Sequence, residues 1–200
     1  MHKPALAFVA ASLATALTAA PALAAPTTWE IDPAHSAATF SVKHMMVSTV
    51  RGEFGKLSGM ITVEGGDWKT AKVEATVDAT TINTREPKRD THLKSADFFD
   101  VAKYPTLTFK STKVDVGGAG YKLYGDLTIR GVTKPIVFDV QPPSKEWKGL
   151  MGKMVVGTSA TAKLNRKDFG LNWNRPLEAA GGMLVGDEVT ITLDLELVKK

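Results

Sequence analysis

The sequence Val-Thr-Ile-Thr-Leu-Asp-Leu-Glu-Leu occupies residues 189–197 and decides the fold class. Its odd-numbered positions are all apolar, and its even-numbered positions carry hydroxyl or acidic side chains. Successive side chains of a β-strand point to opposite faces of a sheet. The alternation therefore predicts a strand with one buried face and one solvated face.

The same alternation returns along most of the chain and predicts eight or nine strands. The further segments are residues 38–44, 57–64, 72–79, 106–110, 121–130, 136–140 and 154–164. Glycine-containing turns separate many of them, at residues 64–67, 116–120, 130–131 and 186–187. Strands with a single dry face are typical of antiparallel sheets, whereas parallel sheets are buried on both faces. The chain is therefore predicted to be all-β and antiparallel.

Small side chains occupy several positions on the apolar strand faces. They are Ala75, Ala79, Ala160 and Ala162. An eight-stranded antiparallel barrel with small inward residues can leave room for a ligand. A two-sheet sandwich fits the alternation equally well, so the pattern alone leaves barrel and sandwich open.

One block, residues 84–101, breaks the alternation. Its 85–95 segment predicts a single short helical insertion, with Asn83 or Thr84 as the N-cap and Pro87 in the first turn. We see no fixed-period repeat and no low-complexity tract, so residues 25–200 are interpreted as one domain.

The first 24 residues have the composition of a cleaved leader. His2 and Lys3 form a short basic start, a small apolar run follows, and residues 22–24 (Ala-Leu-Ala) supply a cleavage site. We therefore predict a signal peptide over residues 1–24 and a soluble mature protein in the periplasm. The apolar run is shorter than the ~20 residues of a spanning helix, so stable membrane insertion is not expected.

The composition excludes several classes of chemistry. None of the 200 residues is cysteine, which excludes disulfides, a thiolate nucleophile and Cys-bound metals. The 25 Lys and Arg residues are dispersed and nearly balanced by 21 Asp and Glu residues, so nucleic acid is not an expected partner. Exposed strand edges could support a homodimer, but the sequence shows no interface.

Several blocks of the sequence together resemble the YceI family. They are WEIDPAHS (residues 29–36), FSVKHMM (40–46), VRGEFG (50–55), RDTHLKSADFFDV (89–101), YPT (104–106), GDLTIRGVT (125–133) and NRKDFGL (165–171). The resemblance covers essentially the whole chain after the leader. It implies a lipocalin-like antiparallel barrel around an apolar tunnel that holds a polyisoprenoid or another long-chain amphiphile. It does not imply which lipid is bound.

The expected ligand site combines an apolar tunnel with a few polar side chains at its mouth. The apolar candidates are Phe40, Val42, Phe54, Phe98, Phe99, Leu123, Leu127, Phe138, Ala160 and Phe169. His44 falls on the inward parity of its strand, and a polar group on a dry face needs a partner. That partner is either a protein group or the head group of a ligand. Arg51, Arg89 and His92 are the other head-group candidates.

No metal, cofactor or catalytic residue is predicted. His35, His44 and His92 could supply imidazole ligands to zinc, but no H-x-H or H-E-x-x-H spacing is present. The resemblance to the YceI family implies a protein that carries or stores a long-chain isoprenoid or fatty-chain lipid, and this is our hypothesis. Two alternatives stay open: an enzyme that uses His44 or His92 as acid or base in an apolar chamber, and a stress or interaction protein whose packed barrel holds no ligand.

Overall fold

The computed structural model describes residues 25–149, 152–177 and 181–200. These residues form the strands β1 (Thr27–Ile31), β2 (Ala37–His44), β3 (Ser48–Phe54), β4 (Leu57–Val63), β5 (Lys72–Asp78), β6 (Ile82–Asn83), β7 (Thr106–Gly117), β8 (Gly120–Ile129), β9 (Val132–Val140), β10 (Trp147–Lys148), β11 (Met154–Asn165) and β12 (Val185–Lys199). They also form the helix α1 (Pro87–Lys94) and the 3-10 turns η1 (Trp68–Thr70), η2 (Ala79–Thr81) and η3 (Arg166–Phe169). The predicted signal peptide lies outside the described residues.

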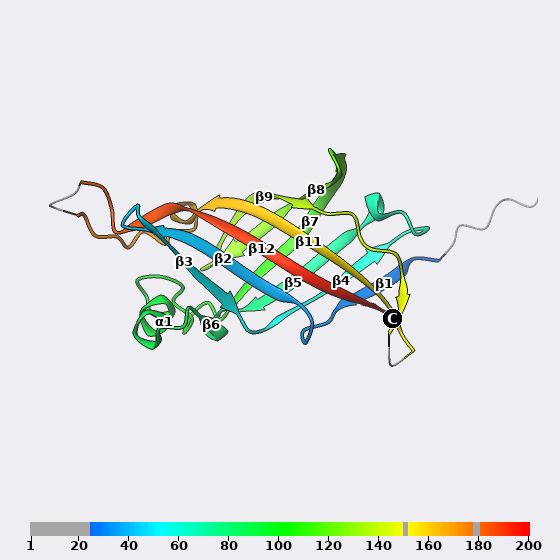
Figure 1. The fold of residues 1–200 in the computed structure, drawn as a ribbon, viewed down its shortest axis with the longest axis horizontal. Coiled ribbons are helices and arrows are strands. Elements are labelled where there is room, and N and C mark those ends of the chain that lie inside the picture. Colours follow the sequence, from blue (N-terminus) through cyan, green and yellow to red (C-terminus); the bar gives the residue numbers. More distant parts are fainter. Residues whose placement is uncertain (1–24, 150–151, 178–180) are drawn as a thin grey trace, which may run out of the picture.

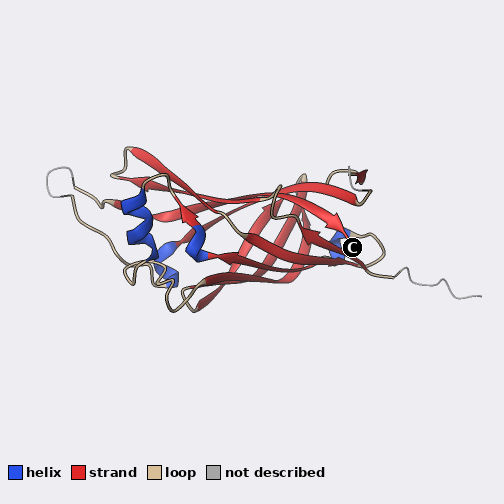
Figure 2. Ribbon diagram, turned by 90° about the horizontal axis from the view of Figure 1, so that it is seen from below, coloured by secondary structure: helices blue, strands red, loops and turns tan. Residues whose placement is uncertain are grey.

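Eight of the strands close an antiparallel barrel. The order around the ring is β1-β4-β5-β7-β8-β9-β11-β12, and β12 pairs with β1 to complete the circle. Figure 2 shows the strands wrapped about the long axis of the molecule, with α1 at the left-hand end. The predicted all-β barrel with one short helix is confirmed, and the sandwich alternative is wrong.

Strand β12 has two partners along one of its edges. Residues 185–194 pair with β2 and the last residues pair with β1, while the other edge follows β11. From β2 the sheet continues through β3 to β6, so these strands extend the wall beyond the ring on the side of α1 (Figure 1). The alternation predicted β2 but missed β1, β3, β6 and β10, because β6 and β10 are only two residues long and the apolar faces of β1 and β3 carry only two apolar side chains each.

Helix α1 starts later than the sequence predicts. Its N-cap is Glu86, so neither Asn83 nor Thr84 has that role. Arg85 has a φ of 64°, and this left-handed residue separates the preceding pair from the helix. Thr84 instead donates its amide N–H and its hydroxyl to the Asp90 carboxylate. No helix among the described residues is long and apolar enough to cross a membrane.

Two clusters of buried apolar side chains stabilise the barrel. The cluster at the α1 end includes Phe98, Phe169 and Leu171, which come from outside the strands. The other cluster includes Trp29 and Leu197 and joins β1 to the end of β12. Ala79, predicted on a strand, is buried but opens η2 instead, because the Asp78 side chain caps that turn.

Candidate functional site

An apolar cavity of about 180 Å³ lies inside the barrel. All eight strands of the ring contribute to its lining, together with β2 and β3. The lining side chains are apolar except for Thr39, Thr108, Thr158 and Tyr121. An engineered cavity of about 150 Å³ is large enough to bind benzene, so this cavity accepts an apolar group without rearrangement. The packed-barrel alternative predicted that no cavity exists, and the structure contradicts it.

The alternating pattern explains which predicted residues line the cavity. They are Phe40, Phe54, Leu123, Leu127, Phe138 and Ala160. Ala160 stands opposite Leu193, and Leu123 stands opposite Phe138, so partners on neighbouring strands face the same interior. Ala75 also lines the cavity, whereas Ala162 packs in the cluster at the α1 end.

Two glycines make room for aromatic rings in the cavity wall. A Cβ atom at Gly52 would lie 2.5 Å from the Phe40 ring, and one at Gly125 would lie 2.4 Å from the Phe109 ring. The Phe109 ring in turn packs edge-on against Phe138, with 5.4 Å between the ring centroids. A side chain at either glycine would push a ring toward the cavity, so the glycines help to set its width.

Aromatic side chains close the end of the barrel that carries α1. Phe98 and Phe169 are buried there, and the His92 ring packs edge-on against Phe98 and Trp173 with centroids 5.1 and 4.8 Å apart. The His92 Nε2 atom lies 2.9 Å from a carboxylate oxygen of Asp97. These predicted site residues therefore form a plug at the end of the barrel and do not line the cavity.

Two predicted residues of β2 and one that follows α1 also lie outside the cavity. Val42 and His44 share the inward face of β2 with Phe40, as their parity predicts, but lie nearer the end of β2, opposite Val189 and Val185 of β12, and do not line the cavity. Phe99 packs edge-on against Phe54, with 5.8 Å between centroids, and against the buried cluster at the α1 end, without lining the cavity.

The two predicted arginines have separate surroundings. Arg51 is exposed and lies in a polar groove over β2, β3 and β6. Arg89 donates from Nε to the Thr84 hydroxyl at 2.7 Å and from Nη2 to the Thr84 carbonyl at 2.9 Å. The structure therefore does not bring these guanidinium groups to the cavity.

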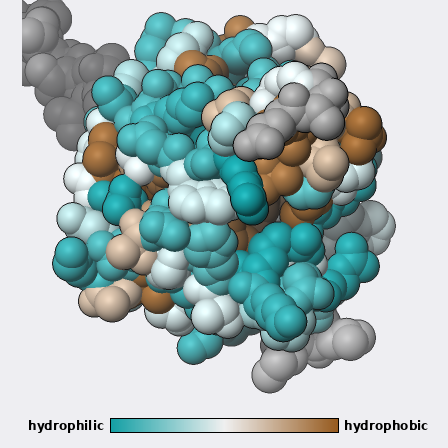
Figure 3. All heavy atoms as spheres, turned by 90° about the vertical axis from the view of Figure 1, so that its left-hand side faces the viewer, coloured by the Kyte–Doolittle hydropathy of each residue, from teal (hydrophilic) through white to brown (hydrophobic). Residues whose placement is uncertain are grey.

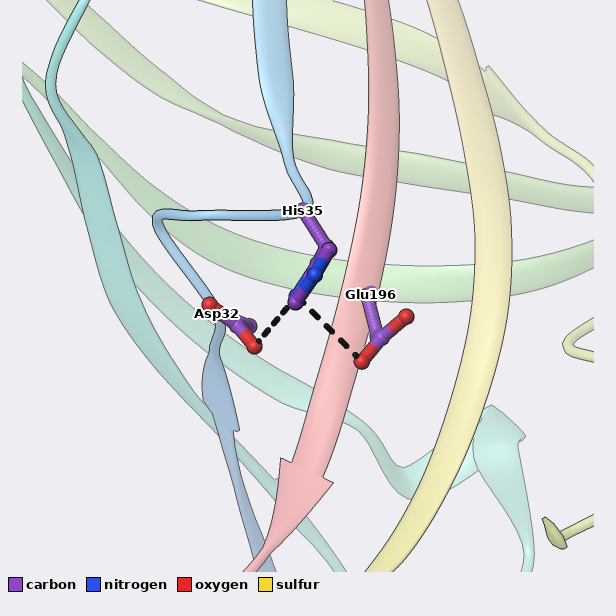
Figure 4. A group of neighbouring side chains, drawn as sticks. All are labelled: Asp32, His35 and Glu196. Carbon is purple, nitrogen blue, oxygen red and sulfur yellow. Dashed lines mark hydrogen bonds and ion pairs between the residues drawn. The ribbon is translucent and has the colours of Figure 1, made fainter. Parts of the chain in front are cut away.

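An exposed polar cluster lies where the chain passes from β1 to β2. The His35 Nδ1 atom is 2.9 Å from an Asp32 oxygen and 3.8 Å from a Glu196 oxygen, and Figure 4 shows the ring between the two carboxylates. The hydrogen bond to Asp32, and then the charges of Asp32 and Glu196, raise the pKa of His35. The same hydrogen bond lowers the pKa of Asp32. In the sequence, His35 stands out only as one of three histidines that could bind zinc.

Arg166 is a buried charged residue that sequence reasoning missed. It is 4% exposed and donates to the carbonyl oxygens of Gly186 and Trp173 at 2.9 Å, and to that of Leu171. Burial lowers its pKa, opposed by the charge of Asp187, and the guanidinium stays protonated. Arg166 thereby holds η3, the chain after it and the start of β12 together.

The family follows from comparison with known proteins. A family model of the YceI-like domain matches residues 29–197. The chain belongs to the YceI family. A UPF0312 protein of Staphylococcus aureus is 36% identical over 170 residues, which are 85% of this chain and 96% of that protein. The solved YceI protein of Campylobacter jejuni is 31% identical with a TM-score of 0.66, over 79% of this chain and 90% of that one.

A more distant structure shares the YceI barrel. A polyisoprenoid-binding domain from Saccharophagus degradans superposes with a TM-score of 0.59 at 17% identity, over 86% of this chain and 98% of that one. At that identity the likeness shows the fold alone. Within this YceI chain, several of the blocks that indicated the family form corners and the plug. Residues 29–36 contain the Asp32–His35 turn, residues 89–101 contain most of α1 and the segment after it, and residues 165–171 contain Arg166.

Proposed function

We propose that the mature protein is an exported periplasmic binding protein that holds the tail of a polyisoprenoid or another long-chain amphiphile in the barrel. The observation that carries the proposal is the apolar lining of the internal cavity. Each methylene group that leaves water contributes about 0.8 kcal/mol, so a long tail binds tightly without elaborate polar contacts. The physical role would be to carry or store one lipid in an aqueous compartment.

Two further observations support the ligand class and the compartment. The Saccharophagus degradans domain of the same fold bears the name of a polyisoprenoid-binding domain. The first 24 residues have the pattern of a secretory leader, which supports export.

The cavity holds only part of a long tail. The rest of the tail extends along the barrel, and the end away from the plug offers the partly buried side chains of Trp68, Val114 and Tyr121. In our proposal the tail contacts the lining residues, led by Phe40, Phe54, Leu123, Leu127, Phe138 and Ala160. A ligand long enough to pass the plug would reach Val42, His44, Arg51, Arg89, His92, Phe98, Phe99 and Phe169.

No observation favours the enzyme alternative. It needs an acid or base inside the apolar chamber, and its candidates His44 and His92 both lie outside the cavity. Within the described part of the chain, the residues that line the cavity include no His, Asp, Glu, Lys or Arg. We therefore propose binding without catalysis.

The test is native mass spectrometry of the mature protein purified from the periplasm of its own host, followed by lipid extraction. We expect a co-purifying mass whose fragments repeat in isoprene or methylene steps. An apo mass that stays unchanged after incubation with polyprenols, quinones and fatty acids would contradict the proposal. The N-terminus of the purified protein, read in the same spectra, tests cleavage after Ala24.

A further inference from the structure

Four exposed apolar side chains gather at one extremity of the molecule. Met45, Met46 and Val47 form the β2–β3 turn and are 42%, 66% and 82% exposed, and Met183, just before β12, is 39% exposed. Figure 1 places the β2–β3 turn at the left-hand end of the long axis, the end that carries α1. Figure 3 looks onto this end and shows hydrophobic side chains gathered on one part of a mostly hydrophilic face. We call these four residues the apolar tip.

The backbone of the β2–β3 turn makes this choice of residues unusual. Met45 and Met46 have φ values of 51° and 62°, and the Val47 N–H donates to the His44 carbonyl at 3.2 Å. Two consecutive positive φ values characterise a type I′ turn, which strongly favours Asn-Gly because a Cβ atom is disfavoured there. Large apolar side chains in this turn are therefore unfavourable in two ways: their Cβ atoms disfavour the positive φ values, and their apolar surface is exposed to water. This double cost indicates that they serve an interaction.

Hydrogen bonds fix the tip in one arrangement. The Met45 N–H donates to the Leu184 carbonyl at 2.8 Å, and the Leu184 N–H donates to the Arg175 carbonyl at 2.8 Å. The Asn174 side chain bonds the Val185 carbonyl at 2.7 Å and the Val185 N–H at 3.0 Å. The β2–β3 turn and the segment before β12 are thus tied to one another, and the four apolar side chains are presented together.

Among the described residues, the exposed charge next to the tip is basic. Lys43 and Arg175 are exposed next to it, at the end of β2 and in the bonded segment. The nearby carboxylates of Asp187 and Glu188 are each paired with a lysine at 2.8 Å. The tip therefore combines protruding apolar side chains with basic groups around them, a composition that suits an anionic membrane surface.

We propose that the apolar tip docks the protein onto the surface of an anionic phospholipid bilayer. The Met and Val side chains enter the boundary between head groups and acyl chains, and Lys43 and Arg175 face the phosphates. This inference rests on the proposed function, since a protein that carries a lipid has to exchange it with a membrane. A bilayer fits better than a protein partner, because the tip lies on a turn at the extremity of the molecule and the exposed basic groups of Lys43 and Arg175 flank it, which matches an anionic surface.

The test is flotation of the mature protein with vesicles of phosphatidylethanolamine and phosphatidylglycerol, compared with vesicles of phosphatidylcholine alone. The variant Met45→Asn/Met46→Gly removes two apolar side chains and gives the turn its preferred sequence, so it should melt at or above the wild-type temperature. We expect its partitioning onto the anionic vesicles to fall by about tenfold or more. The control Val116→Asn changes an equally exposed side chain on β7 (64% exposed) and should float like the wild type.

Each outcome separates this inference from the proposed function. Wild-type protein that loads a polyprenol from ethanol but does not float with anionic vesicles would overturn the docking proposal alone. Flotation without loading of polyprenols, quinones or fatty acids would overturn the proposed function and leave docking in place. Equal flotation of the wild type and the Met45→Asn/Met46→Gly variant would show that another surface binds the bilayer. A tip-dependent dimer in analytical ultracentrifugation, without flotation, would assign the tip to a second copy of the chain and overturn docking.

Discussion

Replacing Ala160 with tryptophan should fill the cavity and abolish lipid binding while the fold survives. Ala160 is 4% exposed, lines the cavity, and pairs with Leu193 on one side and Val140 on the other. The cavity volume of about 180 Å³ slightly exceeds the ~150 Å³ of an engineered cavity that binds benzene. An indole ring added at this position therefore occupies most of the free space.

The expected size of the effect follows from the carbon atoms that the indole displaces. A ring of this size takes the place of about six methylene groups of the tail, each worth about 0.8 kcal/mol on burial. The loss is about 5 kcal/mol, which is more than a thousandfold in Kd. Overpacking a filled core costs about 1–3 kcal/mol, but here the ring enters free space, so the free energy of unfolding should change by less than about 1 kcal/mol.

Binding is measured by titration with a fluorescently labelled polyprenol, and stability by urea unfolding. The matched control is Thr161→Trp, which places the same ring on the exposed face of the same strand. Wild-type affinity of the Ala160→Trp variant at unchanged stability would refute the reasoning, because the ligand would then not use the cavity. Destabilisation by more than about 3 kcal/mol would show that the interior is filled.

Three further substitutions test the wall, the polar cluster and the buried guanidinium. Gly125→Ala should lower the free energy of unfolding, measured in urea, by about 2 kcal/mol because the new Cβ atom clashes with Phe109. The control Gly157→Ala should cost far less, because its Cβ atom would lie 3.9 Å from the nearest neighbour. The raised pKa of His35 means that the folded state holds this proton more tightly than the unfolded state. The protonated ring therefore stabilises the folded state fully below the ordinary pKa of 6.5, and this stabilisation is lost as the pH rises through the raised pKa. His35→Gln should remove that part of the pH dependence of Tm, and an unchanged profile would assign it to another group. Arg166→Met should lower the free energy of unfolding by about 3 kcal/mol because buried carbonyl oxygens lose their donor, and Arg166→Lys should restore part of it.

The inward face of each long strand could be predicted from the sequence because parity is a local property. In β12, Ile191, Leu193, Leu195 and Leu197 alternate without interruption, and all of them line the cavity. The cavity itself could only be suspected, from small residues such as Ala160. Whether such residues leave a void depends on the rings opposite them, and those are set by strand register, which alternation does not specify.

The candidate site was harder to predict because it depends on how far each strand runs along the barrel. His44 has the inward parity of Phe40, but it pairs with Val185, which precedes the stretch of β12 that pairs with β11, so His44 lies beyond the end of that wall. Nothing in the local pattern marks where the pairing ends. The role of Arg166 was also hidden, because its carbonyl partners belong to irregular segments and to Gly186, twenty residues away.

The chemistry of the cavity limits which part of an amphiphile it can hold. Its lining offers the hydroxyl groups of Thr39, Thr108, Thr158 and Tyr121 but no charged side chain in the described part of the chain. An ionised head group moved into such a site would lose its hydration without a compensating partner, at a cost of several kcal/mol. A bound amphiphile would therefore keep its head group at the opening, and its affinity would depend on the length and branching of the tail. Discrimination between lipids that share a tail would have to come from groups outside the barrel.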